Sequence, residues 1–293
     1  MLGEFPKVTI AVPLYRSRRF LAIVASTLRT LNYPNIEVLI SDRHREDDAI
    51  ECLQQEFSLD QRFRFLIGED RLDWRSHYNL LLSEASGEYF IWVSHDDSYS
   101  ADYIMRLVEA LEKNPDAIMA YGQVERIDLN GKPLTYAPSR IHHHDGPPGV
   151  LTAYRIVTSA GLQFHGVFRR SLLVDRELYI RPTASNIAAD MLWLFTVAMI
   201  GRMVFVESCT FFKRYYPSST HKTWDSLMRP GYAWNFARVA CSYLDAFAQK
   251  RFERGLGKIM VWATCGVWAI RLSLRPFVRR FWPSLYPAPK ADV

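Results

Sequence analysis

The chain has 293 residues, 49% of them hydrophobic, which is enough for the core of one large domain or of one domain with an extension. Its formal net charge of +5 belongs to the end of the chain, because residues 251–293 carry eight Lys or Arg and two acids, whereas the first 250 residues carry 28 bases and 29 acids. With no helix-turn-helix, zinc-finger or RNP-like segment in the sequence, this distribution argues against a nucleic-acid partner.

The cysteines and the first residues indicate a cytosolic protein. Cys52, Cys209, Cys241 and Cys265 are widely spaced and show no metal-ligand pattern, so we expect reduced core residues. Residues 1–7 lead directly into a strand pattern, with neither a basic segment nor a long apolar one, and predict no export signal. We therefore expect a cytoplasmic location, and the C-terminal tail described below extends this expectation to the inner face of the membrane.

Strand and helix patterns alternate over the first half of the chain. Residues 7–13 form a nearly continuous β-branched run typical of the middle of a parallel sheet, and apolar residues at helical spacing follow it and end before Asn32. Such alternation predicts right-handed βαβ units and a mainly parallel sheet. Further strands are predicted at 36–40, 63–67 and 89–93, and helices near 46–57 and 74–85.

The second half of the chain is less regular. A strand at 117–121 and a hairpin around 129–132 are predicted ahead of a segment rich in His, Gly and Pro at 142–149. Its three consecutive histidines cannot all face one metal ion from a regular element, so we favour a solvated loop over a metal site. A helix at about 188–200, strands near 203–215 and mostly helical residues from 225 onward complete the prediction.

An apolar run at residues 87–93 is followed closely by two adjacent carboxylates, Asp96 and Asp97. Acids just beyond a buried strand emerge at the carboxyl edge of the sheet, where open α/β folds bind ligands. Hard divalent ions take oxygen ligands there, commonly one or two carboxylates together with substrate phosphates. The pair therefore indicates a cation site, and the alternative is that Asp96 caps a helix beginning near Ser100 while Asp97 is solvated.

Several further motifs occur in a fixed order along the chain. They are Thr9 to Tyr15 (TIAVPLY), Tyr33 to Asp42 (YPNIEVLISD), Asn79, Ala85 to Tyr89 (ASGEY), Asp96-Asp97, Gly166 to Arg170 (GVFRR) and Ala189-Asp190. In this order and at these spacings, residues 5 to about 220 resemble glycosyltransferase family 2, enzymes of the GT-A fold that transfer a sugar from a nucleotide donor. The resemblance favours the metal site at Asp96 and Asp97 over the helix cap.

The resemblance implies a GT-A type fold: a Rossmann-like, mixed and mainly parallel sheet flanked by helices, here with a helical C-terminal extension. It also implies that Asp97, with Asp96, holds Mn²⁺ or Mg²⁺, which would neutralise the charge on the leaving diphosphate. Asp42 corresponds to the base contact, and because uracil and guanine offer a ring N–H to a carboxylate, UDP-sugar is the leading donor and GDP-sugar the second. The implied donor contacts are Pro13, Tyr15, Asp42, Asn79 and Asp96.

Asp190 matches the acidic residue that inverting members of the family use as general base. A carboxylate at a helix start, close to the departing phosphate, would take the proton of the acceptor hydroxyl as it attacks the anomeric carbon. The alternative is an N-cap for the apolar helix that follows, and the two roles are compatible. The resemblance favours the base.

Some positions depart from the family pattern. Ser94 and Ala189 stand where many members carry acids. The turn after Asp42 reads Arg43-His44-Arg45, and its two additional basic residues either contact donor phosphates or, as we favour, are solvated. Late in the domain, Tyr216 stands where relatives often place a histidine, and His221 follows nearby. His221 either completes the metal shell or is a surface histidine.

The C-terminal tail combines apolar, aromatic and basic residues. The apolar stretch from Ile259 to Ile270 is far shorter than the roughly 20 residues that span a bilayer. Flanked by Arg271, Arg275, Arg279 and Arg280, it indicates an interfacial helix on anionic lipid, which would suit a lipid-linked acceptor. The alternative is a helix packed on the catalytic domain or in a dimer interface.

These inferences predict a metal-dependent, inverting glycosyltransferase acting on a glycan or lipid-linked acceptor, in synthesis of a surface polysaccharide or glycoconjugate. We expect a GT-A domain at 1–224, with the nucleotide-sugar half at about 1–125 and the acceptor half at about 126–224, and a helical extension at 225–293. One competing interpretation is a sugar nucleotidyltransferase, which would carry a glycine-rich loop after the first strand, where this chain has no glycine. The other is a non-catalytic sugar- or nucleotide-binding homologue.

Overall fold

The computed structural model describes residues 5–68, 70–134, 147–157, 162–216, 230–248 and 250–281, with the backbone alone for 156, 157 and 275–281. In these residues, eight strands form one sheet in the order β3-β2-β1-β4-β7-β6-β8-β5. The strands are β1 (Val8–Leu14), β2 (Ile36–Asp42), β3 (Phe63–Ile67), β4 (Tyr89–Trp92), β5 (Ser98–Tyr99), β6 (Ala117–Ile127), β7 (Val167–Arg169) and β8 (Arg202–Arg214).

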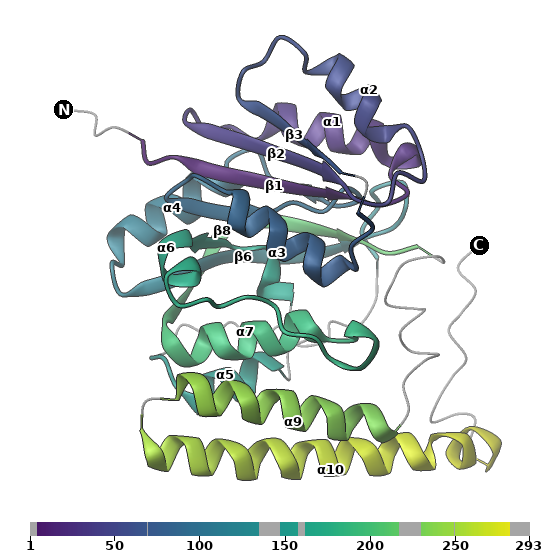
Figure 1. Ribbon diagram of the computed structural model, residues 1–293, viewed down its shortest axis with the longest axis vertical. Coiled ribbons are helices and arrows are strands. Elements are labelled where there is room, and N and C mark those ends of the chain that lie inside the picture. The colour runs from purple at the N-terminus through teal and green to yellow at the C-terminus, as the bar shows by residue number, and fades with distance from the viewer. Residues whose placement is uncertain are drawn as a thin grey trace.

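Helices cover both faces of this sheet (Figure 1). The predicted fold class, a mixed and mainly parallel sheet flanked by helices, is thereby confirmed: β1, β2, β3 and β4 run parallel, as do β6 and β8, and β7 and β5 pair antiparallel with their neighbours. The α-helices are α1 (Leu21–Thr30), α2 (Ala49–Glu56), α3 (Trp74–Glu84), α4 (Tyr103–Lys113), α5 (Val150–Val157), α6 (Arg170–Val174), α7 (Ala189–Ile200), α9 (Pro230–Phe247) and α10 (Arg251–Phe281).

The strands divide their side chains between two cores because successive residues of a strand point to opposite faces. In β1, Val8, Ile10, Val12 and Leu14 face the core beneath α1, α2 and α4, whereas Ala11 faces the other one. Burial on both faces explains why this strand reads as a continuous apolar run. The second core lies under α3 and α7 and is built on stacked aromatic rings; Trp92 lies 4.7 Å from Phe164 and 5.2 Å from Trp193, between ring centroids.

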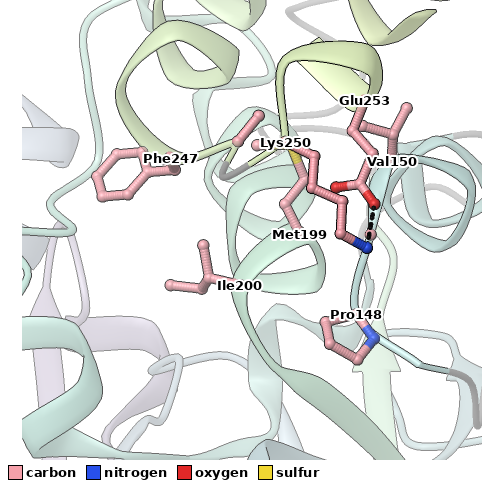
Figure 2. Close-up of a pocket in the computed structure, with 9 residues that line it drawn as sticks. Pro148, Val150, Met199, Ile200, Phe247, Lys250 and Glu253 are labelled. Carbon is pink, nitrogen blue, oxygen red and sulfur yellow. Dashed lines mark ion pairs between the residues drawn. The ribbon is translucent and has the colours of Figure 1, made fainter.

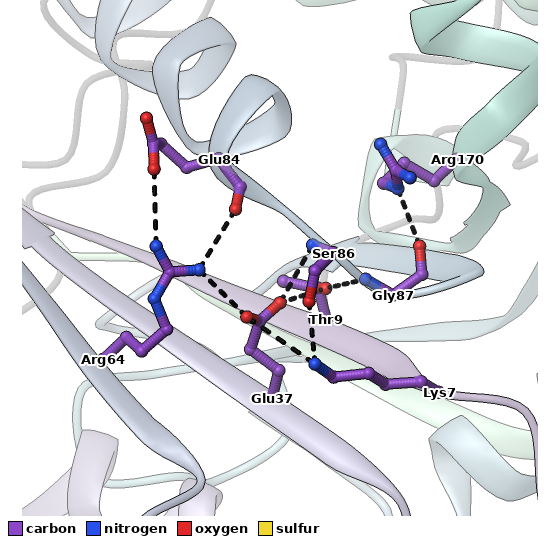
Figure 3. Close-up of polar contacts among 8 residues, drawn as sticks. All are labelled: Lys7, Thr9, Glu37, Arg64, Glu84, Ser86, Gly87 and Arg170. Atoms are coloured by element: carbon purple, nitrogen blue, oxygen red, sulfur yellow. Dashed lines mark hydrogen bonds and ion pairs between the residues drawn. The ribbon is translucent and has the colours of Figure 1, made fainter.

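A polar network fixes the amino edge of the parallel strands (Figure 3). The Glu37 carboxylate on β2 accepts hydrogen bonds from Thr9 Oγ1 (2.8 Å), Ser86 N (3.0 Å) and Arg64 Nη1 (3.0 Å). The Gly87 N–H donates to Thr9 Oγ1 at 2.8 Å, and a Cβ at Gly87 would lie 2.6 Å from the backbone nitrogen of Thr9. The Ala85 to Tyr89 motif therefore has a structural role: it lets the turn before β4 close against β1.

The structure changes some predicted elements. The strands expected near 203–215 are one long strand, β8, whose pairing with β6 shifts register between Gly122 and Gln123. The hairpin expected around 129–132 is present, with a bridge between Ile127 and Pro133. Residues 98–99 form β5 and α4 begins at Tyr103 with Asp102 as N-cap, so Asp96 is not a helix cap. Residues 142–146 and the expected boundary at 224/225 lie outside the described residues.

The C-terminal helices form a further layer, seen below α7 and α5 in Figure 1. In α10, Val261, Cys265 and Ala269 are buried in the core shared with α7 and α9. One face of this helix therefore packs on the protein, as the packing alternative for the tail predicts. Its opposite face exposes large apolar side chains, which are 43% to 77% accessible. They are Phe252, Ile259, Trp262, Val267, Ile270 and Leu274. None of the helices in the described part of the chain is both long and apolar enough to cross a membrane.

Candidate active site

The carboxyl ends of β1, β2 and β4 meet at one edge of the sheet. The parallel register pairs Leu14 with Asp42 and Ala11 with Trp92, so the residues that follow these strands emerge together. Tyr15 follows β1, Asp42 ends β2, and the acid pair comes after β4. This is the edge at which open α/β sheets bind ligands.

Asp97 is fully buried, and both of its carboxylate oxygens have protein partners. Lys213 Nζ donates to Oδ2 at 2.8 Å and the backbone N–H of Arg214 donates to Oδ1 at 2.8 Å. Burial raises the pKa of Asp97 to about 6, and the adjacent ammonium opposes that shift. Burial alone would lower the pKa of Lys213, but Asp97 and Asp96 outweigh it and raise that pKa, so the ammonium is charged at neutral pH.

Asp96 is nearly buried and is held by the end of β8. The Tyr216 hydroxyl donates to its Oδ2 at 2.8 Å, and Arg214 Nε donates to its backbone carbonyl at 2.7 Å. Burial opposes ionisation, but the positive charge of Lys213 and the Tyr216 hydroxyl help to bring the pKa of Asp96 down to about 2. Asp96 is therefore a carboxylate at any physiological pH.

Arg214 joins the acid pair to the hairpin after β6. Its Nη1 donates to the carbonyls of Asp128 and Leu129, both at 2.9 Å, while its Nε holds Asp96 as described. The guanidinium is planar and carries several donors, so it can bind three carbonyls at once. Lys213, Arg214 and Tyr216 thus connect the strand end to residues more than 80 positions away.

Asp42 shapes the turn after β2. Its Oδ1 accepts the backbone N–H groups of His44 and Arg45, each at 2.8 Å, and Arg45 takes a left-handed conformation with φ 47°. The other oxygen, Oδ2, has no donor among the described residues, and the side chain is 1% exposed. The ring of Tyr15, 45% exposed, packs edge-on against His44 with 4.8 Å between ring centroids, and Pro13 lies buried in β1.

Asn79, an expected donor contact, is occupied by the protein. Its Nδ2 donates to the carbonyl of Ile180 at 3.0 Å, and its Oδ1 accepts the backbone N–H of the same residue at 2.8 Å. The side-chain amide thus pairs with the backbone of the loop that leads to α7. This arrangement favours a positioning role over direct contact with a donor.

Asp190 lies in the first turn of α7, and the N-cap position belongs to Ala188 in a left-handed conformation with φ 54°. The Asp190 Oδ1 accepts the N–H of Met191 at 2.9 Å. Burial raises the pKa of Asp190, and the charge of Lys213 opposes this shift. The Asp190 carboxylate therefore interacts electrostatically with the same ammonium that pairs with Asp97. The N-cap alternative for Asp190 is therefore excluded, and a carboxylate with a raised pKa suits proton transfer.

Comparisons with known proteins identify the family of this arrangement. The model of glycosyl transferase family 2 matches residues 9–172, more than half of the chain. The chain belongs to glycosyltransferase family 2. An uncharacterized glycosyltransferase of Rickettsia bellii is 27% identical over 154 residues, 52% of this chain and 21% of that protein, and glycosyltransferase GlyG of Streptococcus pneumoniae is 26% identical over 113 residues, 38% of each protein.

Solved structures of low sequence identity share the fold of this glycosyltransferase. S. aureus TarS 1–349 in complex with UDP-GlcNAc matches with a TM-score of 0.68 and 15% identity, over 96% of this chain and 76% of that one. The mannosyltransferase PcManGT of Pyrobaculum calidifontis, in complex with GDP-Man and Mn²⁺, matches with a TM-score of 0.56 and 13% identity, over 96% and 82%. By contrast, the chain spans only about a fifth of the length of the Rickettsia relatives.

The residues around the acid pair decide how well this family member can hold a divalent ion there. In the described part of the chain, no group of three or more His, Cys, Asp or Glu side chains is placed to hold a metal. Tyr216 hydrogen-bonds Asp96, and His221 lies outside the described residues. The acid pair is instead satisfied by a lysine, an arginine and a tyrosine from the end of β8.

A small hollow on the glycosyltransferase lies elsewhere (Figure 2). It has a volume of about 170 Å³ and lies where α5, α7, α9 and α10 meet, lined among others by Pro148, Met199 and Phe247. The ion pair between Lys250 and Glu253, 3.5 Å between charged atoms, stands at its wall. Because Met199 is near the end of α7 opposite to Asp190, about 13 Å of helix separates this wall of the hollow from Asp190.

Proposed function

We propose that this chain transfers a sugar from a nucleotide-sugar donor to an acceptor hydroxyl, with inversion at the anomeric carbon. The observation that carries the proposal is the placement of carboxylates at the carboxyl edge of the sheet. Asp42 ends β2 and Asp96 follows β4, the two strands that flank β1, and the buried ammonium of Lys213 acts electrostatically on Asp96 and on Asp190. Membership of glycosyltransferase family 2 supports the reaction class. UDP-GlcNAc and GDP-Man, bound by TarS and PcManGT, support a nucleotide-sugar donor.

In this proposal Asp42 recognises the base of the donor. Its Oδ1 is used by the turn, whereas its Oδ2 has no protein donor among the described residues, and the proposal assigns this second oxygen to a ring N–H of the base. Uracil and guanine present such an N–H, whereas adenine presents only its amino group. UDP-sugar is therefore the favoured donor and GDP-sugar the second. Tyr15 and Pro13 would flank the nucleotide, and Asp96 would face its ribose.

Asp190 is the proposed general base. As the acceptor oxygen attacks the anomeric carbon from the face opposite the diphosphate, its proton passes to the Asp190 carboxylate. Burial raises the pKa of this group, which increases its basicity. Because the acceptor oxygen attacks from the face opposite the leaving diphosphate, the configuration at the anomeric carbon is inverted.

A resident divalent ion fits this site poorly. Both oxygens of Asp97 are taken by Lys213 and the Arg214 backbone, and Asp96 accepts from Tyr216. An ion on Asp97 would lie beside an ammonium, and at an effective dielectric constant of about 20, like unit charges about 4 Å apart repel by about 4 kcal/mol. The Mn²⁺ of the PcManGT complex belongs to that protein, and no step proposed for this chain passes through a metal.

The acceptor is proposed to be a glycan or a lipid-linked saccharide of a surface polysaccharide or glycoconjugate, at the inner face of the membrane. The exposed apolar face of α10 supports this placement, because Phe252, Ile259 and Ile270 have no partner among the described residues that covers them. The helix carries seven Lys or Arg and one acid, a charge suited to anionic lipid. In this proposal α10 lies flat on the membrane while its other face packs on the protein.

Nucleotide binding and turnover test the proposed function together. Thermal unfolding is measured with UDP-GlcNAc, GDP-mannose and dTDP-glucose, because a ligand at 100 times its Kd stabilises the native state by about 2.7 kcal/mol. We expect the UDP-sugar to raise the melting temperature most, and UDP release to accelerate with a saccharide acceptor. A raised melting temperature without release of nucleoside diphosphate, whichever acceptor is added, would support the non-catalytic interpretation. If none of the three nucleotide-sugars raised the melting temperature, the proposal would be contradicted.

A further inference from the structure

Lys213 is a buried cation that the sequence motifs do not indicate. It lies near the end of β8, paired with Arg126 of β6, and 9% of its surface is exposed. Its ammonium donates to Asp97 Oδ2 at 2.8 Å. An ammonium has three N–H donors, and in the part of the chain that the structure describes, the other two have no hydrogen-bond partner.

The position of this ammonium is unusual for an ion pair that only stabilises the fold. Its charge acts on Asp96 and Asp190 as well as on Asp97, so it lies among the three carboxylates expected to surround the reacting groups. Asp97 is fixed independently by the backbone of Arg214 at 2.8 Å. One carboxylate therefore neutralises and orients Lys213, while its remaining donors are left for another anion.

Sugar transfer needs a positive charge beside the leaving diphosphate. The bond between the anomeric carbon and the diphosphate oxygen breaks, and its electron pair goes to that oxygen. At the same time a bond forms between the acceptor oxygen and the anomeric carbon, and the acceptor proton passes to Asp190. Negative charge then develops on the leaving diphosphate, and a preorganised cation in a water-poor site stabilises it. Lysine binds phosphate as a compact point charge, and it keeps all its protons through this step.

We propose that the Lys213 ammonium, held by Asp97, is the cation that stabilises the leaving diphosphate, in place of a divalent metal ion. The inference rests on the proposed function, because it concerns the same donor. Tyr216 fits the arrangement, since its hydroxyl holds the Asp96 carboxylate, which makes no hydrogen bond to the ammonium among the described residues. The consequence is that this chain binds and uses its donor without an added metal.

The test is UDP binding, measured by calorimetry on the full chain in EDTA and again with Mn²⁺. We expect wild-type protein to bind UDP in EDTA, with less than a threefold gain from Mn²⁺. Lys213→Met should weaken binding in EDTA by more than tenfold and Lys213→Arg by much less. Because Lys213→Met leaves Asp97 buried without its partner, the double variant Lys213→Met/Asp97→Asn removes both charges and should show the same loss in a folded protein.

Asp97→Asn alone separates the two accounts of the acid pair. If Lys213 is the cation, this change frees the ammonium from its counter-charge and UDP binds more tightly in EDTA. If Asp97 holds a metal, the same change weakens Mn²⁺-dependent binding by more than tenfold. Lys258→Met, which breaks the ion pair with Asp245 on the outer helices, is the matched control and should leave binding unaltered.

Binding that requires Mn²⁺ in the wild type and is lost in Asp97→Asn would overturn this inference while leaving the proposed function intact. Binding in EDTA that Lys213→Met/Asp97→Asn retains in full would also overturn it. Failure of the wild type to bind UDP or GDP with and without Mn²⁺ would instead contradict both the inference and the proposed function.

Discussion

Replacing Asp42 with Asn should change the nucleotide preference while the fold is kept. The Asn side chain retains one carbonyl oxygen, which can still accept the two backbone N–H groups of His44 and Arg45. Where Asp42 has Oδ2, Asn places an NH₂ group, which faces the ring N–H of uracil donor to donor. A hydrogen bond to a charged group contributes about 1.5–3 kcal/mol, so UDP affinity should fall by about 10- to 150-fold.

Cytosine gives this prediction a positive outcome as well as a loss. Its ring nitrogen at the same position is an acceptor, which pairs with the new NH₂ group, so the ratio of CDP to UDP affinity should rise in Asp42→Asn. Calorimetric titration of both nucleotides into both proteins measures the ratio, and the melting temperature shows that the turn is kept. Asp42→Ala, which also removes the turn acceptor, should lower the melting temperature. An unchanged CDP to UDP ratio in the Asn variant would refute the base assignment.

Three further predictions concern the fold and the outer helix. Glu37→Gln should lower the free energy of unfolding by about 1.5–3 kcal/mol at pH 7, because an amide cannot accept all the hydrogen bonds of the carboxylate. Burial raises the pKa of Glu37, but the hydrogen bonds from Ser86, Thr9 and Arg64 outweigh burial and hold this pKa below 4.5. In urea denaturation, the difference in free energy of unfolding between the two proteins should therefore be complete above about pH 4.5 and shrink as the pH falls further. A constant difference down to pH 2 would contradict this. Gly87→Ala should destabilise the protein, because its Cβ would lie 2.6 Å from a backbone nitrogen, and a wild-type melting temperature would show that the turn before β4 is not close-packed. Changing the exposed Phe252, Ile259 and Ile270 of α10 together to Glu should abolish binding to anionic vesicles in a flotation assay and leave the melting temperature unaltered, and wild-type binding should fall with salt; equal flotation of the two proteins would exclude this face as the membrane contact.

The sheet and its edge could be predicted because their signals are local. Buried parallel strands read as continuous apolar runs, and the acid pair after residues 87–93 marks the end of one of them. From these patterns the strand order cannot be read, but the edge at which Asp42, Asp96 and Asp97 emerge can. The same holds for α7, whose apolar run places Asp190 in its first turn.

The partners of these carboxylates could not be predicted, because they come from distant parts of the chain. Lys213 and Asp97 are separated by 116 positions, and nothing in the sequence around Lys213 marks it as facing an acid. Asn79 is a second case: the family motif predicts a donor contact, and in the fold its side chain also pairs with the backbone of Ile180, 101 positions away, which the motif does not indicate. Tyr216 is a departure from the family pattern that the sequence shows locally, and the structure places its hydroxyl on Asp96.

Turnover by Asp190→Asn is the most direct test of the central claim that this chain is an inverting glycosyltransferase. Asn keeps the size of the side chain and an oxygen to accept the Met191 N–H, but it cannot take a proton. We expect release of nucleoside diphosphate, with a saccharide acceptor, to fall by about 10²–10⁴-fold, while donor affinity and melting temperature stay close to wild type. Wild-type turnover in Asp190→Asn, with the protein folded and the donor bound, would contradict the account.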